Sequence, residues 1–213
     1  MNVETVNRRV KRGVTSRIPT SFGDFQLCLY TEGKDENEHF ALIMGNVRGR
    51  SNVLVRVQSE CFTGEVIGSS RCDCREQLNL AMQNIAAEGG GVLIYLRQGG
   101  RGMGLRDKLR AYNLQDQGYD TVDANLLLGH RADERDYTLA ACILEDLQIR
   151  SIRLLTNNPR KVGRLRELGV RVRQRLPLHP TVNESNFRYL LTKALRMNHT
   201  LNVGATSQHR EAG

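Results

Sequence analysis

The sequence lacks any long apolar run, and aromatic residues make up only 5% of its 213 residues. A helix that crosses a membrane needs about 18 or more mostly apolar residues in succession, and no segment approaches that length. The basic residues near the N-terminus are not followed by the apolar stretch of a secretory signal. We therefore expect a cytoplasmic protein that does not associate with membranes.

The motifs of nucleic-acid-binding proteins are also lacking. The net charge of +8 implies an anionic partner, but the positive charge is dispersed along the chain. No helix-turn-helix, RNA-recognition or zinc-finger spacing is found, and aromatic residues are not interleaved with basic ones for base stacking. We therefore expect no nucleic-acid partner, although composition alone does not identify the anion.

The length suits one domain with a sizeable core, since no internal repeat or linker divides the chain. We expect residues 1–17 to form a flexible basic arm, residues 18–200 to form the folded domain, and residues 201–213 to form a disordered tail.

Strand-like and helical segments alternate through this domain. Helical periodicity covers residues 76–88, 105–117 and 136–147. Such alternation predicts a layered α/β fold, a mixed sheet flanked by helices. The predicted strands are residues 25–30, 40–44, 53–57, 92–96, 152–155 and 170–173.

Three of the five cysteines, Cys61, Cys72 and Cys74, lie within fourteen residues of one another. Their spacing favours three thiolate ligands on one zinc ion, which leaves a coordination position for water and so indicates a hydrolytic enzyme. Burial in the core or a disulfide would also account for them. Cys28 and Cys142 stand in apolar runs and are expected in the core.

Two junctions between a strand and a helix have the composition of anion-binding sites. The glycine-rich segment 97–104 follows a predicted strand and contains Arg97 and Arg101, whose guanidinium groups suit phosphate oxygens. Glycines after a strand also simply form turns. The segment 154–161 ends in Asn-Asn-Pro-Arg-Lys, where an ordinary capped helix is the alternative to a ligand site. The charged run 132–137 is typical of a solvated helix cap.

Several long motifs occur together in one order. They are RVQSECFTGE at residues 56–65, RCDC at 71–74, YLRQ at 95–98, GRG at 100–102, AYNLQDQG at 111–118 and LLTNNP at 154–159. This set resembles GTP cyclohydrolase II over about residues 18–200. The resemblance implies a single domain of that type. It also implies that GTP is opened at its imidazole ring, with loss of formate and pyrophosphate, to give 2,5-diamino-6-(5-phosphoribosylamino)pyrimidin-4(3H)-one for riboflavin biosynthesis.

The resemblance also implies roles for individual residues. Cys61, Cys72 and Cys74 match the zinc ligands, with the attacking water at the fourth position, and Tyr112 matches an active-site tyrosine. Asp133 matches the proton acceptor. Arg135 matches the residue that acts at the α-phosphate, where charge stabilisation is an easier role for arginine than nucleophilic attack.

Magnesium bound to the triphosphate and a homodimer are implied as well. The positions that match GTP contacts are Arg56, Val57, Gln58, Ser59, Glu60, Gln77, Gly99, Gly100, Arg101, Thr121, Thr156 and Lys161.

Three positions depart from the family pattern. Relatives commonly read RVHSEC, RQEGR and CDCG where this chain has Gln58, Gly99 and Arg75. Loss of a carboxylate at Gly99 removes a hydrogen-bond acceptor, and Arg75 adds a cation in place of glycine. The alternative to the complete reaction is therefore a paralogue that binds a guanine nucleotide without turnover, or that retains the formyl group and serves a specialised pathway.

Overall fold

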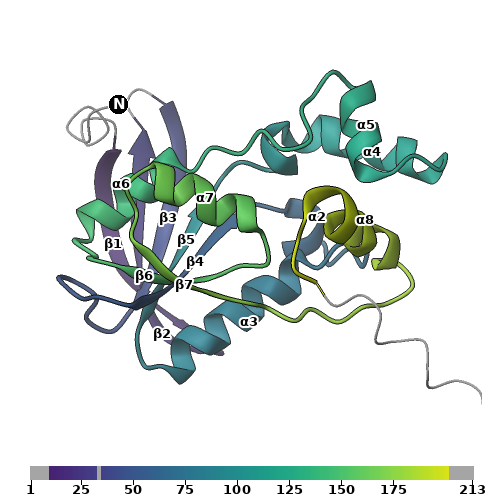
Figure 1. The fold of residues 1–213 in the computed structure, drawn as a ribbon. Coiled ribbons are helices and arrows are strands. Elements are labelled where there is room, and N and C mark those ends of the chain that lie inside the picture. The colour runs from purple at the N-terminus through teal and green to yellow at the C-terminus, as the bar shows by residue number, and fades with distance from the viewer. Residues whose placement is uncertain (1–9, 33–34, 202–213) are drawn as a thin grey trace, which may run out of the picture.

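The computed structural model describes residues 10–32 and 35–201, which form a layered α/β domain around one seven-stranded sheet (Figure 1). The sheet is antiparallel from β1 to β5 and parallel from β5 to β7. In spatial order the strands are β1 (Val10–Thr20), β2 (Gly23–Glu32), β3 (Asp35–Met44), β5 (Gly91–Leu96), β4 (Val53–Ser59), β6 (Ile152–Leu155) and β7 (Val172–Leu176).

Helices cover both faces of the sheet. On one face lie α6 (Thr138–Asp146) and α7 (Pro159–Glu167), whose apolar residues pack on β4, β5 and β6. On the other face lies α3 (Cys74–Ala87), whose buried Ala81, Met82 and Ile85 contact a second apolar cluster. The central strands are therefore apolar on both faces, which is typical of parallel strands.

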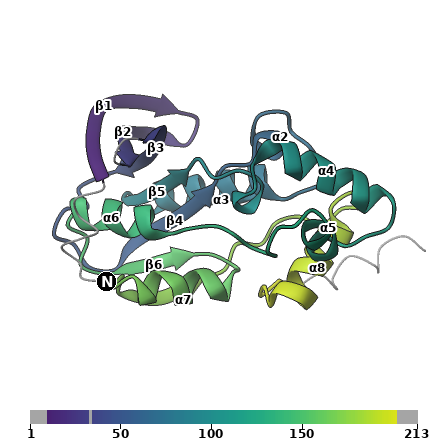
Figure 2. The ribbon, with the colours of Figure 1, turned by 90° about the horizontal axis from the view of Figure 1, so that it is seen from above.

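A separate group of helices lies beyond the carboxyl ends of β4, β5 and β6 (Figures 1 and 2). It comprises α2 (Phe62–Glu65), α4 (Gly104–Asp116), α5 (Thr121–Leu127) and α8 (Phe187–Met197), with the short 3₁₀ helix η1 (Gly100–Gly102) before α4. In α/β sheets ligands bind beyond this edge. The fold thus places the loops that follow β4, β5 and β6 next to this group of helices.

The expected elements are largely confirmed. Five of the six predicted strands lie within β2 to β6, and the three predicted helices correspond to α3, α4 and α6. The sixth strand, predicted at 170–173, begins two residues later as β7. The cysteines expected in the core, Cys28 and Cys142, are both buried.

The flexible arm expected over residues 1–17 is wrong for residues 10–17. These residues belong to β1, which pairs with β2 through backbone hydrogen bonds. Because most of the β1 side chains are exposed, the segment lacks the alternation of apolar and polar residues that marks a half-buried strand. Residues 1–9, and residues 202–213 of the expected tail, lie outside the described part of the chain.

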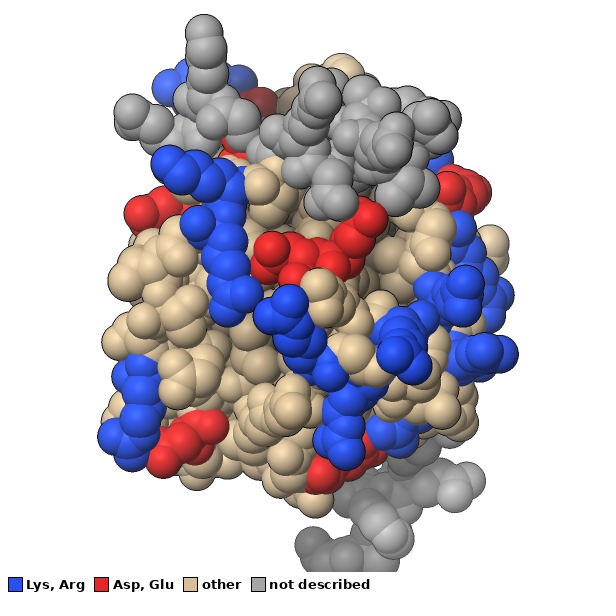
Figure 3. Space-filling model, turned by 90° about the vertical axis from the view of Figure 1, so that its left-hand side faces the viewer, with Lys and Arg blue, Asp and Glu red and all other residues tan. Residues whose placement is uncertain are grey.

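Basic side chains are spread over the face drawn in Figure 3, where they lie among acidic and uncharged ones. The excess of positive charge is therefore not gathered into one patch on this face. Within residues 10–32 and 35–201, no helix is both long enough and apolar enough to span a membrane.

Gly91, the first residue of β5, provides a test of the packing between α3 and the sheet. A Cβ atom there would lie 2.6 Å from the carbonyl oxygen of Leu54 and 3.1 Å from a side-chain carbon of Ile85. We expect Gly91→Ala to lower the free energy of unfolding by about 1–3 kcal/mol because the core is overpacked. Urea denaturation measures this change.

Gly163 in α7 is the matched control, since a Cβ atom there meets nothing within 4 Å. Gly163→Ala should stabilise the protein by up to about 1 kcal/mol, because alanine is the better helix former. Equal effects of the two substitutions would contradict the packing described for Gly91.

Candidate active site

One pocket opens at the carboxyl ends of the parallel strands. Its walls come from β4, from the loops that follow β4, β5 and β6, and from α3, α4, α5, α7 and α8. Six basic side chains reach this pocket, which gives it a strongly cationic interior. They are Arg56, Arg101, Lys108, Arg135, Lys161 and Lys193.

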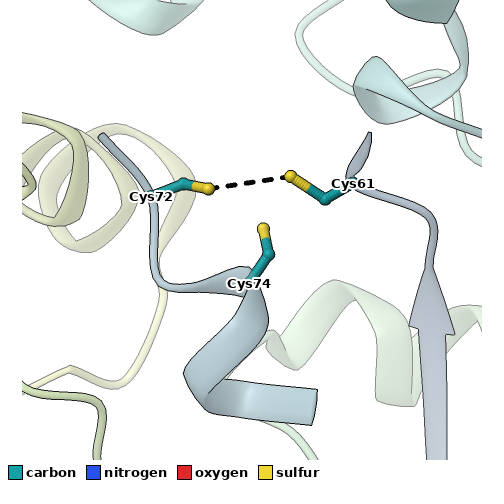
Figure 4. Close-up of side chains that lie close together, drawn as sticks. All are labelled: Cys61, Cys72 and Cys74. Carbon is teal, nitrogen blue, oxygen red and sulfur yellow. Dashed lines mark hydrogen bonds between the residues drawn. The ribbon is translucent and has the colours of Figure 1, made fainter. Parts of the chain in front are cut away.

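Cys61, Cys72 and Cys74 come together at one side of this pocket (Figure 4). Their sulfur atoms all lie within 4.8 Å of one another, those of Cys61 and Cys72 being 3.6 Å apart. Tetrahedral zinc with Zn–S bonds of about 2.3 Å places its sulfur ligands about 3.8 Å apart. None of the three forms a disulfide, so the donor set and its spacing fit a zinc ion.

Backbone geometry and one lysine bring the sulfur atoms together. Cys61 directly precedes α2, and Cys74 begins α3. The ammonium group of Lys108 lies 3.0 Å from the sulfur of Cys61 and donates a hydrogen bond of 2.7 Å to Thr63. Hydrogen bonds from Cys72 and Cys74, together with the charge of Lys108, lower the pKa of Cys61. Cys61 therefore has thiolate character, whereas hydrogen bonds with Cys61 raise the pKa of Cys72 and of Cys74. Metal binding requires all three sulfur ligands to be deprotonated, so a bound metal ion would displace the protons of Cys72 and Cys74.

Tyr112 lies on α4, one turn after Lys108. The Lys108 ammonium is 5.5 Å from the centre of the Tyr112 ring, and the Arg71 guanidinium lies over the ring at 4.5 Å. Burial raises the pKa of Tyr112, so its hydroxyl is protonated near neutral pH. It can donate a proton or a hydrogen bond at the cysteine side of the pocket.

Arg56 connects three elements beneath the pocket. It is only 5% exposed, and its guanidinium donates to the carbonyl of Leu155 at the end of β6 (2.9 Å), to Gln77 on α3 (2.5 Å) and to Gln58 on its own strand (2.7 Å). Gln58 in turn donates to Glu65 on α2 (2.6 Å). All three acceptors of Arg56 are neutral, and burial lowers its pKa to about 10.

The network continues from Gln77 to the cysteine turn and to α8. Gln77 donates to the carboxylate of Asp73, which stands between Cys72 and Cys74. The other carboxylate oxygen of Asp73 accepts a hydrogen bond of 2.6 Å from Lys193 on α8. Both side chains of this ion pair are at least nine-tenths buried. The C-terminal helix is thus fixed to the turn that carries two of the three sulfur atoms.

Two further cations of the pocket, Lys161 and Arg101, form no ion pair within the described residues. Lys161 is 4% exposed and donates to the carbonyl of Val57 at 2.6 Å. Burial, with repulsion from Arg56 and Arg135, lowers its pKa well below the usual value. The terminal nitrogens of Arg101 are buried and lack a hydrogen-bond partner within the described residues. Positive charge of this kind is suited to an anionic ligand.

The run 132–137 is not the solvated cap that its composition suggests. The side chains of Asp133 and Arg135 are 14% and 15% exposed, and they pair through hydrogen bonds of 2.7 Å and 2.5 Å. Burial opposes the charge of Asp133, but the hydrogen bonds from Arg135 outweigh it and lower the pKa of Asp133. The segment turns inward because the backbone of Glu134 packs on the glycine loop, where a Cβ atom at Gly102 would lie 3.0 Å from it.

Most of the site residues inferred from the sequence line this pocket. Four do not line it: Val57, Gly99, Cys72 and Asp133. Cys72 belongs to the sulfur cluster, Asp133 holds Arg135, and Val57 accepts from Lys161. The inferred residues that do line the pocket are Arg56, Gln58, Ser59, Glu60, Cys61, Cys74, Gln77, Gly100, Arg101, Tyr112, Thr121, Arg135, Thr156 and Lys161.

The three departures from the family pattern have different surroundings. Arg75 points away from the sulfur atoms and donates to the carbonyls of Glu65 and Val66 at 2.9 Å and 3.0 Å, so it fastens the end of α2. Gln58 lines the pocket and joins Arg56 to Glu65. A Cβ atom at Gly99 would lie 3.9 Å from the carboxylate of Glu60, so a larger side chain fits there.

Sequence reasoning missed the contribution of α8 and two further residues of α4 and α5. Gln115 and Asn125 face the pocket from α4 and α5, and Tyr189, Lys193 and His199 come from α8 and the residues just after it. Burial beside Lys193 lowers the pKa of His199 to about 3. Residues 187–197, which form α8, are not among the helices predicted from the sequence, so there was no basis for placing this segment over a pocket.

A sequence model of the family "GTP cyclohydrolase II" matches residues 11–177. The chain belongs to the GTP cyclohydrolase II family. The fold and the cysteine cluster described above are therefore features of a member of this family.

Individual relatives are similar over almost the whole chain. It is 50% identical over 198 residues to "GTP cyclohydrolase-2" of Klebsiella pneumoniae, covering 93% of this chain and 99% of that protein. It is 52% identical over 193 residues to "Riboflavin biosynthesis protein RibBA" of Bacillus subtilis, covering 90% of this chain and 48% of that protein. The chain spans about half the length of such RibBA proteins, among them one from Chlamydia trachomatis at 49% identity.

Gly64 tests how tightly the cysteine cluster is packed. A Cβ atom at this position would lie 2.7 Å from the sulfur of Cys72 and 3.1 Å from that of Cys61. We expect Gly64→Ala to push the sulfur atoms apart and to weaken zinc binding by about 10–100-fold, measured by competition with a chromophoric chelator. Unchanged zinc affinity would show that the cluster is not packed as described.

Lys193 tests the link between α8 and the cysteine turn. Lys193→Met leaves the Asp73 carboxylate buried without its cation, and we expect a loss of about 3–5 kcal/mol in the free energy of unfolding. Zinc affinity should fall by about 10–100-fold as well, because Asp73 orients the turn.

The double variant Lys193→Met with Asp73→Asn is the control, since it removes both charges. It should regain a large part of the stability. Urea denaturation and chelator competition measure the two effects, and full zinc affinity in Lys193→Met would disprove the link.

Proposed function

We propose that the protein is a zinc-dependent GTP cyclohydrolase II. It opens the imidazole ring of GTP and gives formate, pyrophosphate and 2,5-diamino-6-(5-phosphoribosylamino)pyrimidin-4(3H)-one. Water is consumed at C8 when the ring opens, again when the formyl group leaves as formate, and at the α-phosphate when pyrophosphate leaves. The observation that carries this proposal is that a three-thiolate cluster and a cationic cradle share one pocket in a chain of this family.

In this proposal Cys61, Cys72 and Cys74 hold zinc, which supplies Lewis acidity towards water and the purine ring. Tyr112 positions the opening ring and gives it a proton, a role that its raised pKa permits. Lys108 keeps Cys61 ionised. Because Lys108 and Tyr112 stand one turn apart on α4, the same helix supports both the thiolate and the proton donor.

The cations of the pocket bind the triphosphate. Arg56 of β4 and Lys161 of α7 are buried, and so are the terminal nitrogens of Arg101 in the glycine loop. Within the described residues none of the three forms an ion pair. An anion there relieves the cost of their burial. Magnesium bound to the triphosphate neutralises the remaining charge, as it does in phosphoryl-transfer enzymes generally.

Arg135 stabilises the charge that develops on the α-phosphate as pyrophosphate leaves. Asp133 holds the Arg135 guanidinium by two hydrogen bonds. When Arg135 engages the phosphate, its hold on Asp133 weakens and the carboxylate becomes the better proton acceptor. The likeness to the family also supports a homodimer and a place in riboflavin biosynthesis.

The test is to incubate zinc-loaded protein with magnesium and GTP, and to follow formate, pyrophosphate and the pyrimidine by mass spectrometry. We expect formate and pyrophosphate in equal amounts. Cys72→Ser should lose both zinc and formate release, because it removes one of three thiolates. Cys28→Ala, a buried cysteine of β2 outside the cluster, should keep them.

The other outcomes distinguish the alternatives. A ring-opened product that keeps its formyl group would identify a paralogue with an altered outcome, and would direct attention to Gln58 and Gly99. Binding of GTP without turnover would identify a nucleotide-binding protein. Full activity and full zinc content in Cys72→Ser would show that the assigned metal site is wrong.

A further inference from the structure

Two walls of the pocket differ in polarity. One wall carries the cations Arg56 of β4, Arg101 of the glycine loop, Arg135 of the segment before α6, and Lys161 in the first turn of α7. The wall formed by α4 and α5 presents two amides, two hydroxyls and apolar groups. Lys108, the cation of α4 that lines the pocket, is engaged by Cys61 and Thr63. The members of the uncharged wall are Met103, Ala111, Tyr112, Gln115, Thr121 and Asn125.

Two amides of the uncharged wall lack hydrogen-bond partners within the described residues. Asn125 is 1% exposed and its side-chain oxygen is unpartnered, as is the buried side-chain nitrogen of Gln115. A buried polar group left without a partner costs about 1–3 kcal/mol. Since both side chains line the pocket, a ligand in the pocket is the partner they lack.

The wall is held rigidly, as a recognition surface must be. Thr121 and Asn125 stand four residues apart and so share one face of α5. The side chain of Asp120 caps the start of α5 by accepting from the backbone of residues 122 and 123. Arg196 of α8 pairs with Asp120 and Asp123. Asn125 is therefore fixed by the helix that carries it.

We propose that Asn125 and Gln115 recognise the guanine base, an inference that rests on the function proposed above. An unpartnered acceptor and an unpartnered donor match the edge of guanine, where N1–H and the 2-amino group donate and O6 accepts. Adenine presents the reverse pattern at N1 and at its 6-amino group. The cationic wall binds the phosphates. The cysteine cluster lies beside both walls, as C8 requires, because this atom of the imidazole ring neighbours N9, which carries the ribose.

The test compares Asn125→Leu and Gln115→Met with the wild type in kcat/KM for GTP and in inhibition constants of ITP and ATP against GTP. Asn125→Leu should lower kcat/KM for GTP by about 10–100-fold, because the base donors lose their acceptor. ITP lacks the 2-amino group, so Asn125→Leu should weaken the binding of ITP less than that of GTP. The preference of this variant for GTP over ITP should therefore be smaller than that of the wild type. Gln115→Met should narrow the preference for GTP over ATP.

Two controls separate base recognition from damage to the fold. Asn113→Leu, an exposed position of α4 outside the pocket, should leave these constants unchanged. Calorimetric binding of inorganic triphosphate should be equal in the wild type and Asn125→Leu, because the cationic wall is untouched. A parallel loss of triphosphate binding in Asn125→Leu would overturn the inference, since the substitution would then act through the fold.

The outcomes also separate this inference from the function on which it rests. A wild-type protein that neither binds nor turns over GTP would refute both. A wild type that turns over GTP, together with variants whose preference among GTP, ITP and ATP is unchanged, would overturn base recognition alone.

Discussion

The site depends on the burial of one cation, Arg56. Its guanidinium is almost fully enclosed and donates only to neutral acceptors on β4, β6 and α3. These hydrogen bonds align the ends of two parallel strands with the helix that carries Cys74. A cation in such surroundings is costly, and its lowered pKa reflects that cost. Under the proposed function, the triphosphate relieves this cost.

From Arg56 a continuous polar network reaches both the cysteine cluster and α8. One branch runs through Gln58 to Glu65, which accepts from the backbone of Cys61. The other branch runs through Gln77 to Asp73 and then to Lys193. The end of β4, the cysteine turns and α8 are therefore one cooperative unit. A change in any of these three alters the positions of the sulfur atoms.

The cationic wall and the uncharged wall of the pocket differ because they are built from different kinds of element. Parallel strands end at a common edge, and the loops after them present free backbone donors and basic side chains to an anion. The helices α4 and α5 instead offer a rigid face of amides and apolar groups. Arg75 fastens α2 and Gln58 joins the network, so both departures have a structural role, whereas Gly99 leaves space beside Glu60.

The sequence by itself determined the alternation of strands and helices, the cysteine cluster and the glycine loop, because these depend on local periodicity and short spacings. It did not determine that β1 is a strand, because backbone pairing with β2 stabilises that segment with little burial. Nor did it place Asn125 or Lys193 in the site. Lys193 meets Asp73 across 120 residues, and only tertiary packing decides which side chains of distant helices face one pocket.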